Sequence, residues 1–232
     1  TAGLILAGAA SAQSNLAELI EQTGVKPGDV PMREMPGWRQ PKKIVTMDVG
    51  VSREEIQALV PGAEVVVYSS STDAMTKAKG ADAIIGYCSK ALIDAAKNAI
   101  WVQVFSAGVD RCVGAERIAD GSVVLTNMQK MSSPVIAEHV IALTLSLARQ
   151  IPQFAKEMQS GRWNRGSDTS DRMMSVAGKT MLVIGLGGIG TEAARRAAAL
   201  DMRVIGTRRS SREGPDFVDY VGLSDELLEL AA

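Results

Sequence analysis

Short apolar runs alternate with helical stretches along the chain from Lys43 onward. Four runs have the length and composition of buried strands, and three helical stretches lie between them. The strands start about every twenty residues, which is typical of βα units. This alternation predicts a parallel sheet covered by helices, that is, an α/β fold. The predicted strands are 43–48, 64–68, 82–87 and 101–105, and the predicted helices are 52–60, 72–79 and 90–99.

A second group of elements follows this first domain. The chain passes through Val123–Asn127 into a predicted helix over Val135–Arg149. Pro134 suits the first turn of this helix, and Ser133 is a candidate for its cap. Apolar residues cover most of the circumference of this helix, so we expect it to be buried between two domains. Residues 150–178 are polar and contain glycine, which indicates a connection leading to the strand at 180.

The most informative motif is a glycine-rich turn between a strand and a helix. The strand starts at Thr180 and runs into Gly185, Gly187 and Gly190, spaced Gly-x-Gly-x-x-Gly, before a helix over Thr191–Leu200. In such motifs the first glycine permits a tight turn, the second lets the backbone approach a pyrophosphate, and the third lets the helix pack against the strand. The motif predicts a nicotinamide or flavin nucleotide held at the helix N-terminus. A glycine turn that serves packing alone is the alternative.

The residues after the next strand bear on which nucleotide binds. In NAD-specific domains this strand, here Met202–Thr207, ends near an Asp or Glu that binds the ribose hydroxyls. Arg208 stands at about that position, and Arg209 follows it. A guanidinium suits a phosphate and gains nothing from a bare ribose, so the sequence favours NADP over NAD. NAD beside a solvated basic turn is the alternative.

The end of the sequence predicts an incomplete nucleotide domain. A full dinucleotide domain has two βαβαβ halves. After the second strand we expect only a short segment, Phe217–Val221, and a last helix, Ser224–Leu230. The strand that closes the first half and the whole second half are absent from this prediction. We therefore expect the chain to be a fragment of a longer protein, because its sheet would otherwise end in an unsatisfied edge.

The beginning of the sequence resembles the end of a secretion signal. Residues 1–12 are apolar and finish with Ala10-Ser-Ala12, a small-x-small cleavage pattern that predicts a mature start near Gln13. This favours export to the periplasm, and a cytoplasmic protein with an alanine-rich helical lead is the alternative. Residues 13–42 are mixed polar sequence with several prolines, and we interpret them as an N-terminal arm.

The amino-acid composition limits the kinds of molecule that we expect the protein to bind. The 232 residues are 46% hydrophobic and 22% charged, which is ordinary for one large or two small globular domains. Lys and Arg (25) nearly balance Asp and Glu (26), so we expect small-molecule partners, without nucleic acid or membrane.

Cys88 and Cys112 lie far apart and fit no metal-ligand spacing, which predicts buried free thiols. The single histidine, His139, leaves little for a zinc site.

The loops after the strands of the first domain are the places where such sheets bind ligands. Two of them combine small and polar residues, namely Gly86–Ser89 and Ser106–Asp110. Backbone N–H groups of the second loop can face an anion such as a carboxylate. A tight strand-to-helix turn without any ligand is equally compatible with these residues.

Three features, taken in order, resemble the D-isomer-specific 2-hydroxyacid dehydrogenase family. The resemblance covers residues 43 to about 230, and it implies a flavodoxin-like substrate domain over 43–126. An incomplete Rossmann domain, a doubly wound parallel sheet that binds NAD(P), is implied over 127–232. The features are Phe105-Ser-Ala-Gly-Val-Asp110, Leu125-Thr-Asn127 followed by Ile136-Ala-Glu-His-Val140, and Ala177-Gly-Lys-Thr-Met-Leu-Val-Ile-Gly-Leu-Gly-Gly-Ile-Gly190.

The resemblance also implies roles for particular residues. Backbone amides of the first loop would hold the substrate carboxylate, amides of the glycine turn would hold the pyrophosphate, and the arginines would hold the NADP phosphate. Serines before the helix would line the nicotinamide cleft. The substrate residues are Ala107, Gly108 and Val109; the cofactor residues are Gly185, Gly187, Gly188, Ile189, Gly190, Arg208, Arg209, Ser132 and Ser133.

The activity implied is hydride transfer between a nicotinamide and a small 2-oxo or 2-hydroxy acid of the glyoxylate or hydroxypyruvate type, by a protein that is a homodimer when complete. The family's catalytic Arg, Glu and His are expected beyond Ala232, so no catalytic residue is assigned and the fragment alone is expected to be inactive. His139 matches the family's helix motif, and we interpret it as a packed helical residue. A non-catalytic, nucleotide-sensing protein of the same fold that responds to redox state is the alternative.

Overall fold

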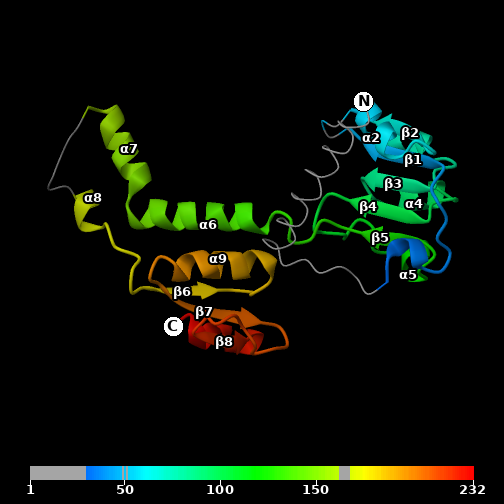
Figure 1. The fold of residues 1–232 in the computed structure, drawn as a ribbon. Helices are drawn as coiled ribbons and strands as arrows, with labels where there is room; N and C mark the ends of the chain where they lie inside the picture. Colours follow the sequence, from blue (N-terminus) through cyan, green and yellow to red (C-terminus); the bar gives the residue numbers. More distant parts are fainter. Residues whose placement is uncertain (1–29, 49, 51, 162–167) are drawn as a thin grey trace, which may run out of the picture. The chain divides into compact units, whose positions relative to one another are not determined.

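The computed structural model describes residues 30–48, 50, 52–161 and 168–232, and Figure 1 draws its ribbon. Within these residues the chain forms two compact units that divide between Gln129 and Lys130. The signal-like residues 1–12 and the first part of the arm lie outside the described residues.

The first unit is built on a five-stranded parallel sheet with the strand order β2-β1-β3-β4-β5. This order is that of flavodoxin-like folds, so the predicted α/β class and its first domain type are confirmed. The strands are β1 (Lys43–Met47), β2 (Glu64–Tyr68), β3 (Ala83–Gly86), β4 (Trp101–Val104) and β5 (Val124–Thr126); the helices are η1 (Met32–Glu34), α2 (Arg53–Leu59), α3 (Ser71–Lys77), α4 (Lys90–Ala95) and α5 (Glu116–Ala119).

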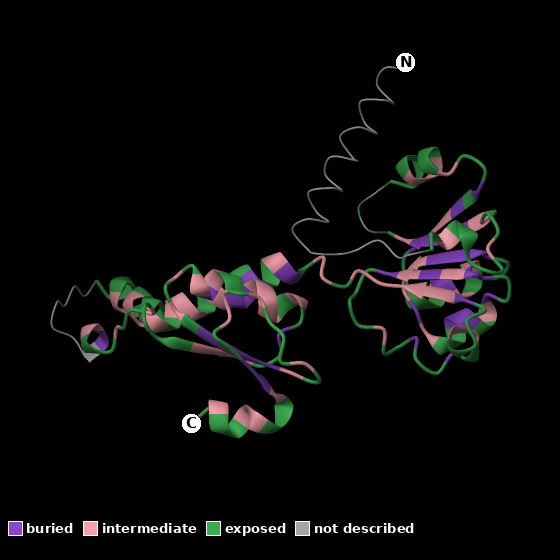
Figure 2. Cartoon of the chain, turned by 60° about the horizontal axis from the view of Figure 1, so that its bottom comes forward, coloured by how far each residue is buried: buried purple, intermediate pink, exposed green. Residues whose placement is uncertain are grey.

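The main core of this unit lies on one face of the sheet, where the buried parts of the strands are purple in Figure 2. Ile84 and Val102 are paired in register and fully buried, and they pack in one cluster with Leu92 and Ile93 of α4. Alternate strand residues point to opposite faces, so Ala83 and its neighbours belong to a smaller second cluster on the other side. The carboxyl ends of the strands meet at one edge because all five run in parallel.

Asp82 ties the arm to the opposite, amino edge of this sheet. Its carboxylate accepts hydrogen bonds from the main-chain N–H groups of Lys42 (2.9 Å) and Lys43 (3.1 Å), and it pairs with the Arg39 guanidinium at 3.0 Å. The side chain is only 12% exposed, and its charge is matched by three donors. The described part of the arm therefore has a defined anchor that its polar sequence did not indicate.

The second unit contains a three-stranded parallel sheet with the order β6-β7-β8. Figure 1 shows α6 and α9 running alongside this sheet, and small buried side chains, Ala137 of α6 and Ala194 and Ala197 of α9, lie in these two helices. Its elements are α6 (Ser133–Ala148), α7 (Ile151–Gln159), α8 (Asp168–Asp171), β6 (Thr180–Val183), α9 (Gly188–Ala198), β7 (Arg203–Arg208), β8 (Tyr220–Leu223), η2 (Ser224–Glu226) and α10 (Leu227–Leu230).

Burial of α6 differs from the prediction. One face packs on α9, but Leu143 and Leu147 on another face are 52% and 67% exposed. His139 is also exposed, so its interpretation as a packed residue is wrong. The apolar character around this helix therefore exceeds what packing within the second unit uses.

Two further elements of the second unit differ from the prediction. The segment predicted as a plain connection contains α7, which starts at Ile151 with Pro152 in its first turn, a position that proline tolerates well. The segment predicted at 217–221 runs into β8 (Tyr220–Leu223), which pairs in parallel with β7 over four residues. The strand that closes the first half of the nucleotide sheet is therefore present, contrary to the prediction.

Candidate functional site

The glycine turn joins the end of β6 to the start of α9. Gly185 has a φ of +95°, a left-handed conformation that favours glycine. A Cβ atom on Gly190 would lie 2.1 Å from the carbonyl oxygen of Gly185 and 3.0 Å from Cγ1 of Val183. Gly190 thus permits the close packing of helix on strand, and Gly185 permits the turn, as predicted.

A buried threonine that sequence reasoning missed holds the turn in place. Thr207, 4% exposed on β7, accepts the N–H of Gly185 at its hydroxyl (3.2 Å) and the N–H of Leu186 at its carbonyl (2.9 Å). These two bonds fix the start of the turn to the neighbouring strand. Only the pairing of β6 with β7 reveals this role, because Thr207 lies more than twenty residues further along the sequence.

The first turn of α9 presents free amides. The helix begins at Gly188, three residues before the predicted start, so the glycine motif itself forms its first turn. Among hydrogen bonds of the described residues, none is donated by the main-chain N–H of Gly187, Gly188 or Ile189. A Cβ on Gly187 would meet nothing within 4 Å. The arrangement suits a bound anion, since the amides and the helix dipole both favour negative charge.

The start of α6 lies directly against this turn. A Cβ on Gly188 would come within 2.7 Å of the Ser133 hydroxyl and 3.0 Å of the Lys130 side chain. Ser133 is only 4% exposed. The N-termini of α6 and α9 therefore meet at one point, so that two helix dipoles act on the same place. The structure thus brings together Ser133 and Gly188, which the sequence analysis placed in one site.

The arginines after β7 have different surroundings. Arg208 is the last residue of β7, and its Nε is buried without a hydrogen-bond partner among the described residues. Arg209 is exposed. Because β6 and β7 are parallel neighbours, Arg208 lies at the same sheet edge as the glycine turn. An unpaired buried guanidinium nitrogen is costly and is well suited to an anionic ligand.

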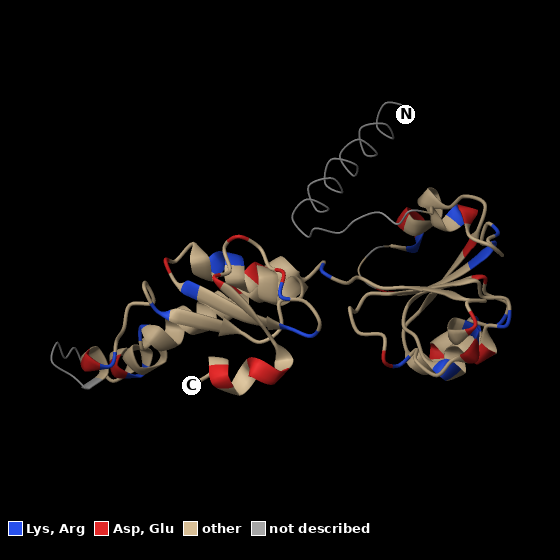
Figure 3. Cartoon of the chain, turned by 90° about the horizontal axis from the view of Figure 1, so that it is seen from below, with Lys and Arg blue, Asp and Glu red and all other residues tan. Residues whose placement is uncertain are grey.

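A third arginine, Arg212, is already hydrogen-bonded and ion-paired within the chain. Its guanidinium donates to the Tyr220 hydroxyl (2.9 Å) and pairs with the Glu226 carboxylate, to which Tyr220 also donates at 2.6 Å. Figure 3 draws the acidic residues of this η2–α10 segment in red beside the C-terminus. The Arg212 guanidinium, the Tyr220 hydroxyl and the N–H of Leu223 hold the pKa of Glu226 at about 2. Arg212 is therefore paired within the chain, whereas the Nε of Arg208 has no hydrogen-bond partner among the described residues.

The predicted carboxylate loop lies in the first unit, at the carboxyl end of β4. The loop is exposed and borders a cavity of about 530 Å³. Its conformation is fixed by two hydrogen bonds, from the Ser106 hydroxyl to the carbonyl of Gly108 (2.6 Å) and from the Asn127 amide to the carbonyl of Ala107 (2.8 Å). Using the carbonyls in this way leaves the loop's N–H groups to face a ligand. The cavity is lined by Gly86, Tyr87, Cys88, Val104, Phe105, Ser106, Gly108, Val109, Asp110, Arg111 and Cys112.

A tyrosine shapes the other wall of this cavity. The Tyr68 hydroxyl donates to the carbonyl of Ile85 (3.1 Å) and accepts the N–H of Tyr87 (2.7 Å). Burial raises the pKa of Tyr68, so it stays a neutral donor. Gly86 has a φ of +109°, and a Cβ there would come within 2.6 Å of the Met47 Cβ. The two hydrogen bonds of Tyr68 thus tie the backbone at the end of β3 to β2.

The two cysteines are not free thiols, contrary to the prediction. Cys88 and Cys112 are both buried, as expected, but they form a disulfide with a Cα–Cα distance of 5.5 Å. They lie 24 residues apart in sequence, and the pairing of β3 with β4 brings the segments that follow these strands together. The spacing of the two cysteines along the sequence cannot reveal that they are close in space.

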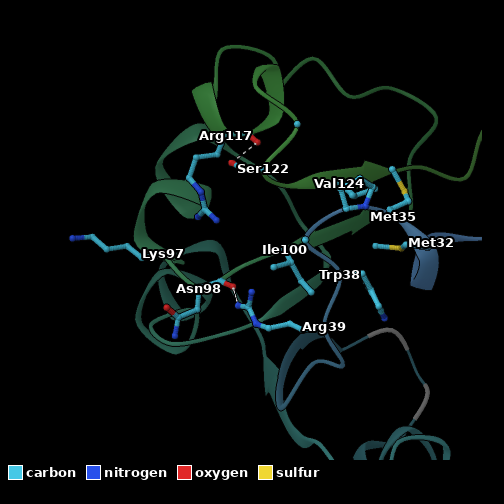
Figure 4. Close-up of a pocket in the computed structure, with 13 residues that line it drawn as sticks. Met32, Met35, Trp38, Arg39, Lys97, Asn98, Ile100, Arg117, Ser122 and Val124 are labelled. Carbon is cyan, nitrogen blue, oxygen red and sulfur yellow. Dashed lines mark hydrogen bonds between the residues drawn. The ribbon is translucent and has the colours of Figure 1, made fainter.

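A second cavity, of about 390 Å³, lies between the arm and the amino ends of β4 and β5 (Figure 4). Its two arginines are occupied within the chain. Arg39 binds Asp82 and the carbonyl of Asn98, and Arg117 donates to the carbonyls of Ala96 and Ala99. Because ligands of parallel sheets bind at the carboxyl ends, we take the cavity beside the Ala107–Val109 loop as the candidate substrate site.

No helix among the described residues has the length and apolar character needed to cross a bilayer. The same residues contain no group of three or more His, Cys, Asp or Glu side chains placed to hold a metal ion.

The chain thus combines a flavodoxin-like unit with a unit that carries a glycine-rich nucleotide turn. Residues 141–232 match the NAD binding domain of D-isomer specific 2-hydroxyacid dehydrogenases. The chain is 32% identical over 182 residues to a D-3-phosphoglycerate dehydrogenase of Archaeoglobus fulgidus, covering 76% of this chain and 31% of the relative. It is 27% identical over 173 residues to a hydroxypyruvate reductase of Thermotoga maritima, covering 75% of this chain and 51% of the relative.

The fold agrees with these matches. A solved structure of a D-isomer specific 2-hydroxyacid dehydrogenase family protein from Aeromonas salmonicida superposes with a TM-score of 0.67 at 24% identity, covering 82% of this chain and 61% of that one. The chain belongs to the D-isomer specific 2-hydroxyacid dehydrogenase family. It spans about a third to a half of the length of the two curated relatives.

Proposed function

We propose that the full-length protein is an NADP(H)-dependent reductase of small 2-oxo acids of the glyoxylate or hydroxypyruvate type. One observation carries the proposal: the N-termini of α6 and α9 meet at Gly188 and Ser133. The buried Nε of Arg208, which has no partner in the described part of the chain, lies at the same end of the sheet. Free amides, two helix dipoles and a guanidinium are the groups that a phosphorylated dinucleotide requires. These residues fit the cofactor.

In this proposal the amides of Gly187, Gly188 and Ile189 hold the pyrophosphate, and Arg208 with Arg209 holds the phosphate on the adenine ribose. Arg208 stands where NAD-specific domains have an acid, and a carboxylate there would repel a phosphate. When bound, the nicotinamide supplies a hydride to the substrate carbonyl. NAD in place of NADP is the alternative that a comparison of affinities decides.

The substrate carboxylate is assigned to the amides of Ala107, Gly108 and Val109. The carbonyls of Ala107 and Gly108 are already occupied by Asn127 and Ser106, which orients the loop as a donor surface. A neutral aldehyde would gain nothing from these amides, so the loop selects acids. Proton transfer at the substrate oxygen is assigned to a histidine outside these 232 residues, because His139 lies exposed on α6.

Two properties of the whole protein complete the proposal. A homodimer is supported by the exposed apolar residues Val135, Leu143 and Leu147 of α6, since a patch of this kind is typical of an association surface.

Export is supported by the signal-like residues 1–12 and by the disulfide, because disulfides persist mainly in oxidising compartments. N-terminal sequencing of the protein from its natural host should then begin near Gln13, and retention of Thr1 would contradict export.

The experiment that tests the activity uses the full-length protein with NADPH. Oxidation of NADPH is measured with glyoxylate, with hydroxypyruvate, and with glycolaldehyde as a neutral aldehyde of similar size. We expect turnover with the two acids and at least about a tenfold lower kcat/KM with glycolaldehyde. Tight NADPH binding without turnover of any 2-oxo acid would instead support a nucleotide-sensing protein of the same fold.

A further inference from the structure

The Cys88–Cys112 disulfide joins the two walls of the candidate substrate cavity. Cys88 lies in the segment after β3, and Cys112 lies three residues after Val109 of the carboxylate loop. Both cysteines line the cavity of about 530 Å³, although they are only 4% and 1% exposed. The disulfide therefore borders the cavity and lies almost entirely beneath its surface.

The carboxylate loop is attached differently on its two sides. Toward β5 it is held by hydrogen bonds, from the Asn127 amide to the carbonyl of Ala107 (2.8 Å) and from the N–H of Met128 to the carbonyl of Ser106 (3.3 Å). Toward β3, the hydrogen bonds of the described residues include none from residues 106–112 to the segment 86–89. The disulfide is the bond that spans this side.

The segment that carries Cys88 is a rigid anchor. The Tyr68 hydroxyl accepts the N–H of Tyr87, the residue next to Cys88, and the neighbours of Gly86 leave no room for a side chain there. Cys112 is coupled directly to the loop, because its N–H donates to the carbonyl of Val109 at 2.8 Å. The disulfide thus connects the rigid wall to the last residue of the proposed carboxylate site.

We propose that this disulfide is a redox-controlled tether of the loop 106–112. When it is formed, the loop is held in the conformation described above. A small dithiol entering the cavity reduces it by thiol–disulfide exchange: the S–S bond breaks, each cysteine sulfur gains one electron and one proton, and the dithiol becomes a disulfide. The reduced loop is free on the β3 side and becomes more mobile. The consequence for ligand affinity rests on the proposed function, because it assumes that Ala107, Gly108 and Val109 bind a carboxylate.

The test compares the oxidised full-length protein with the same protein reduced by dithiothreitol, with the thiol state of Cys88 and Cys112 verified by mass spectrometry. Hydrogen–deuterium exchange is measured on peptides covering 105–113 and, as an internal control, on the β2 peptide 64–68. A Cys88→Ser, Cys112→Ser double variant serves as the permanently untethered protein. Affinities for oxalate, an unreactive carboxylate probe, and for NADPH are measured in parallel.

We expect reduction to speed exchange in 105–113 about tenfold without changing 64–68, and to weaken oxalate binding by about tenfold while the affinity for NADPH stays the same. The double variant should match the reduced protein and should not respond to dithiothreitol. If the variant does not fold, the reduced natural protein decides the question alone. Faster loop exchange with no oxalate binding in either state would support the tether and count against the proposed function.

Three results would overturn the tether. The first is an unchanged exchange rate in 105–113 after verified reduction. The second is measurable oxalate binding with the same affinity in the oxidised and reduced states, which would show that the disulfide does not control ligand binding and would leave the proposed function intact. The third is a disulfide that dithiothreitol reduces only when the protein unfolds.

Discussion

The Ser133 hydroxyl occupies the space next to Gly188, 2.7 Å from the position where a Cβ of that residue would lie. Two helices that are more than fifty residues apart in sequence begin at this contact, and both direct their positive dipole ends to it. Because Ser133 is almost fully buried, the contact is part of the packing of the second unit. The proposed pyrophosphate site is therefore built jointly by both helices.

The glycines of the turn should separate into a structural and a binding class. Gly190→Ala places a methyl group 2.1 Å from the carbonyl oxygen of Gly185, so we expect a loss of about 3 kcal/mol or more in the free energy of unfolding. Gly187→Ala meets nothing within 4 Å, so its stability should change by less than about 1 kcal/mol, while its affinity for NADPH should fall at least about tenfold. Denaturant unfolding and calorimetric titration measure the two effects, and equal stability of the two variants would contradict this assignment.

The arginines after β7 should discriminate between the two nicotinamide nucleotides. Replacing both Arg208 and Arg209 by Ala should weaken NADPH binding by about 1.5–3 kcal/mol more than NADH binding, because charged hydrogen bonds to the extra phosphate are lost. Arg203→Ala, at the other end of the same strand, is the matched control and should leave both affinities unchanged. Equal losses for NADPH and NADH in the double variant would favour NAD as the cofactor.

Glu226 should contribute to stability in a pH-dependent way. Its pKa in the folded protein is about 2, below the ordinary value of 4.5, so its ionised form is the one that folding stabilises. The contribution is complete above pH about 4.5 and is lost as the pH falls toward 2. The difference in unfolding free energy between the natural protein and Glu226→Gln should therefore shrink over this range. Glu229→Gln, which removes a carboxylate that forms no ion pair within the described residues, is the matched control.

The exposed face of α6 should control association. Leu143 and Leu147 are more than half exposed, and placing Glu at both positions puts charge into the proposed contact between two copies. Sedimentation velocity of the full-length protein should show a dimer, and the double variant should be a monomer. Gln159→Glu, at the exposed end of α7, adds charge outside this face and should remain dimeric. A dimer that survives both leucine replacements would place the contact elsewhere.

Much of the fold could be predicted because its signals are local. The apolar composition of β1 to β4, for example Glu64–Tyr68, is enough to predict buried parallel strands. The glycine turn likewise indicates where the nucleotide-binding sheet and helix meet. The short β8 was misjudged because Tyr220–Leu223 contains a glycine and an exposed tyrosine, which give no clear strand pattern. It is a strand because β7 offers it an edge, which is a tertiary effect.

The sites were less accessible to sequence reasoning wherever they depend on contacts between distant residues. Arg208 was identified from its place after a strand, but its buried, unpartnered Nε could not be. The Cys88–Cys112 bond and the support of the glycine turn by Thr207 both arise from neighbouring strands of a sheet. Such pairings follow from strand order, which a single sequence does not specify residue by residue.

The most direct measurement tests whether the hydrogen at C4 of the nicotinamide is transferred to the substrate. The full-length protein is incubated with hydroxypyruvate and NADPH carrying deuterium at the transferable C4 position, and the glycerate produced is analysed for deuterium and for configuration. The account predicts D-glycerate with deuterium bonded to C2. Glycerate without deuterium, glycerate of the L configuration, or no glycerate at all would contradict it.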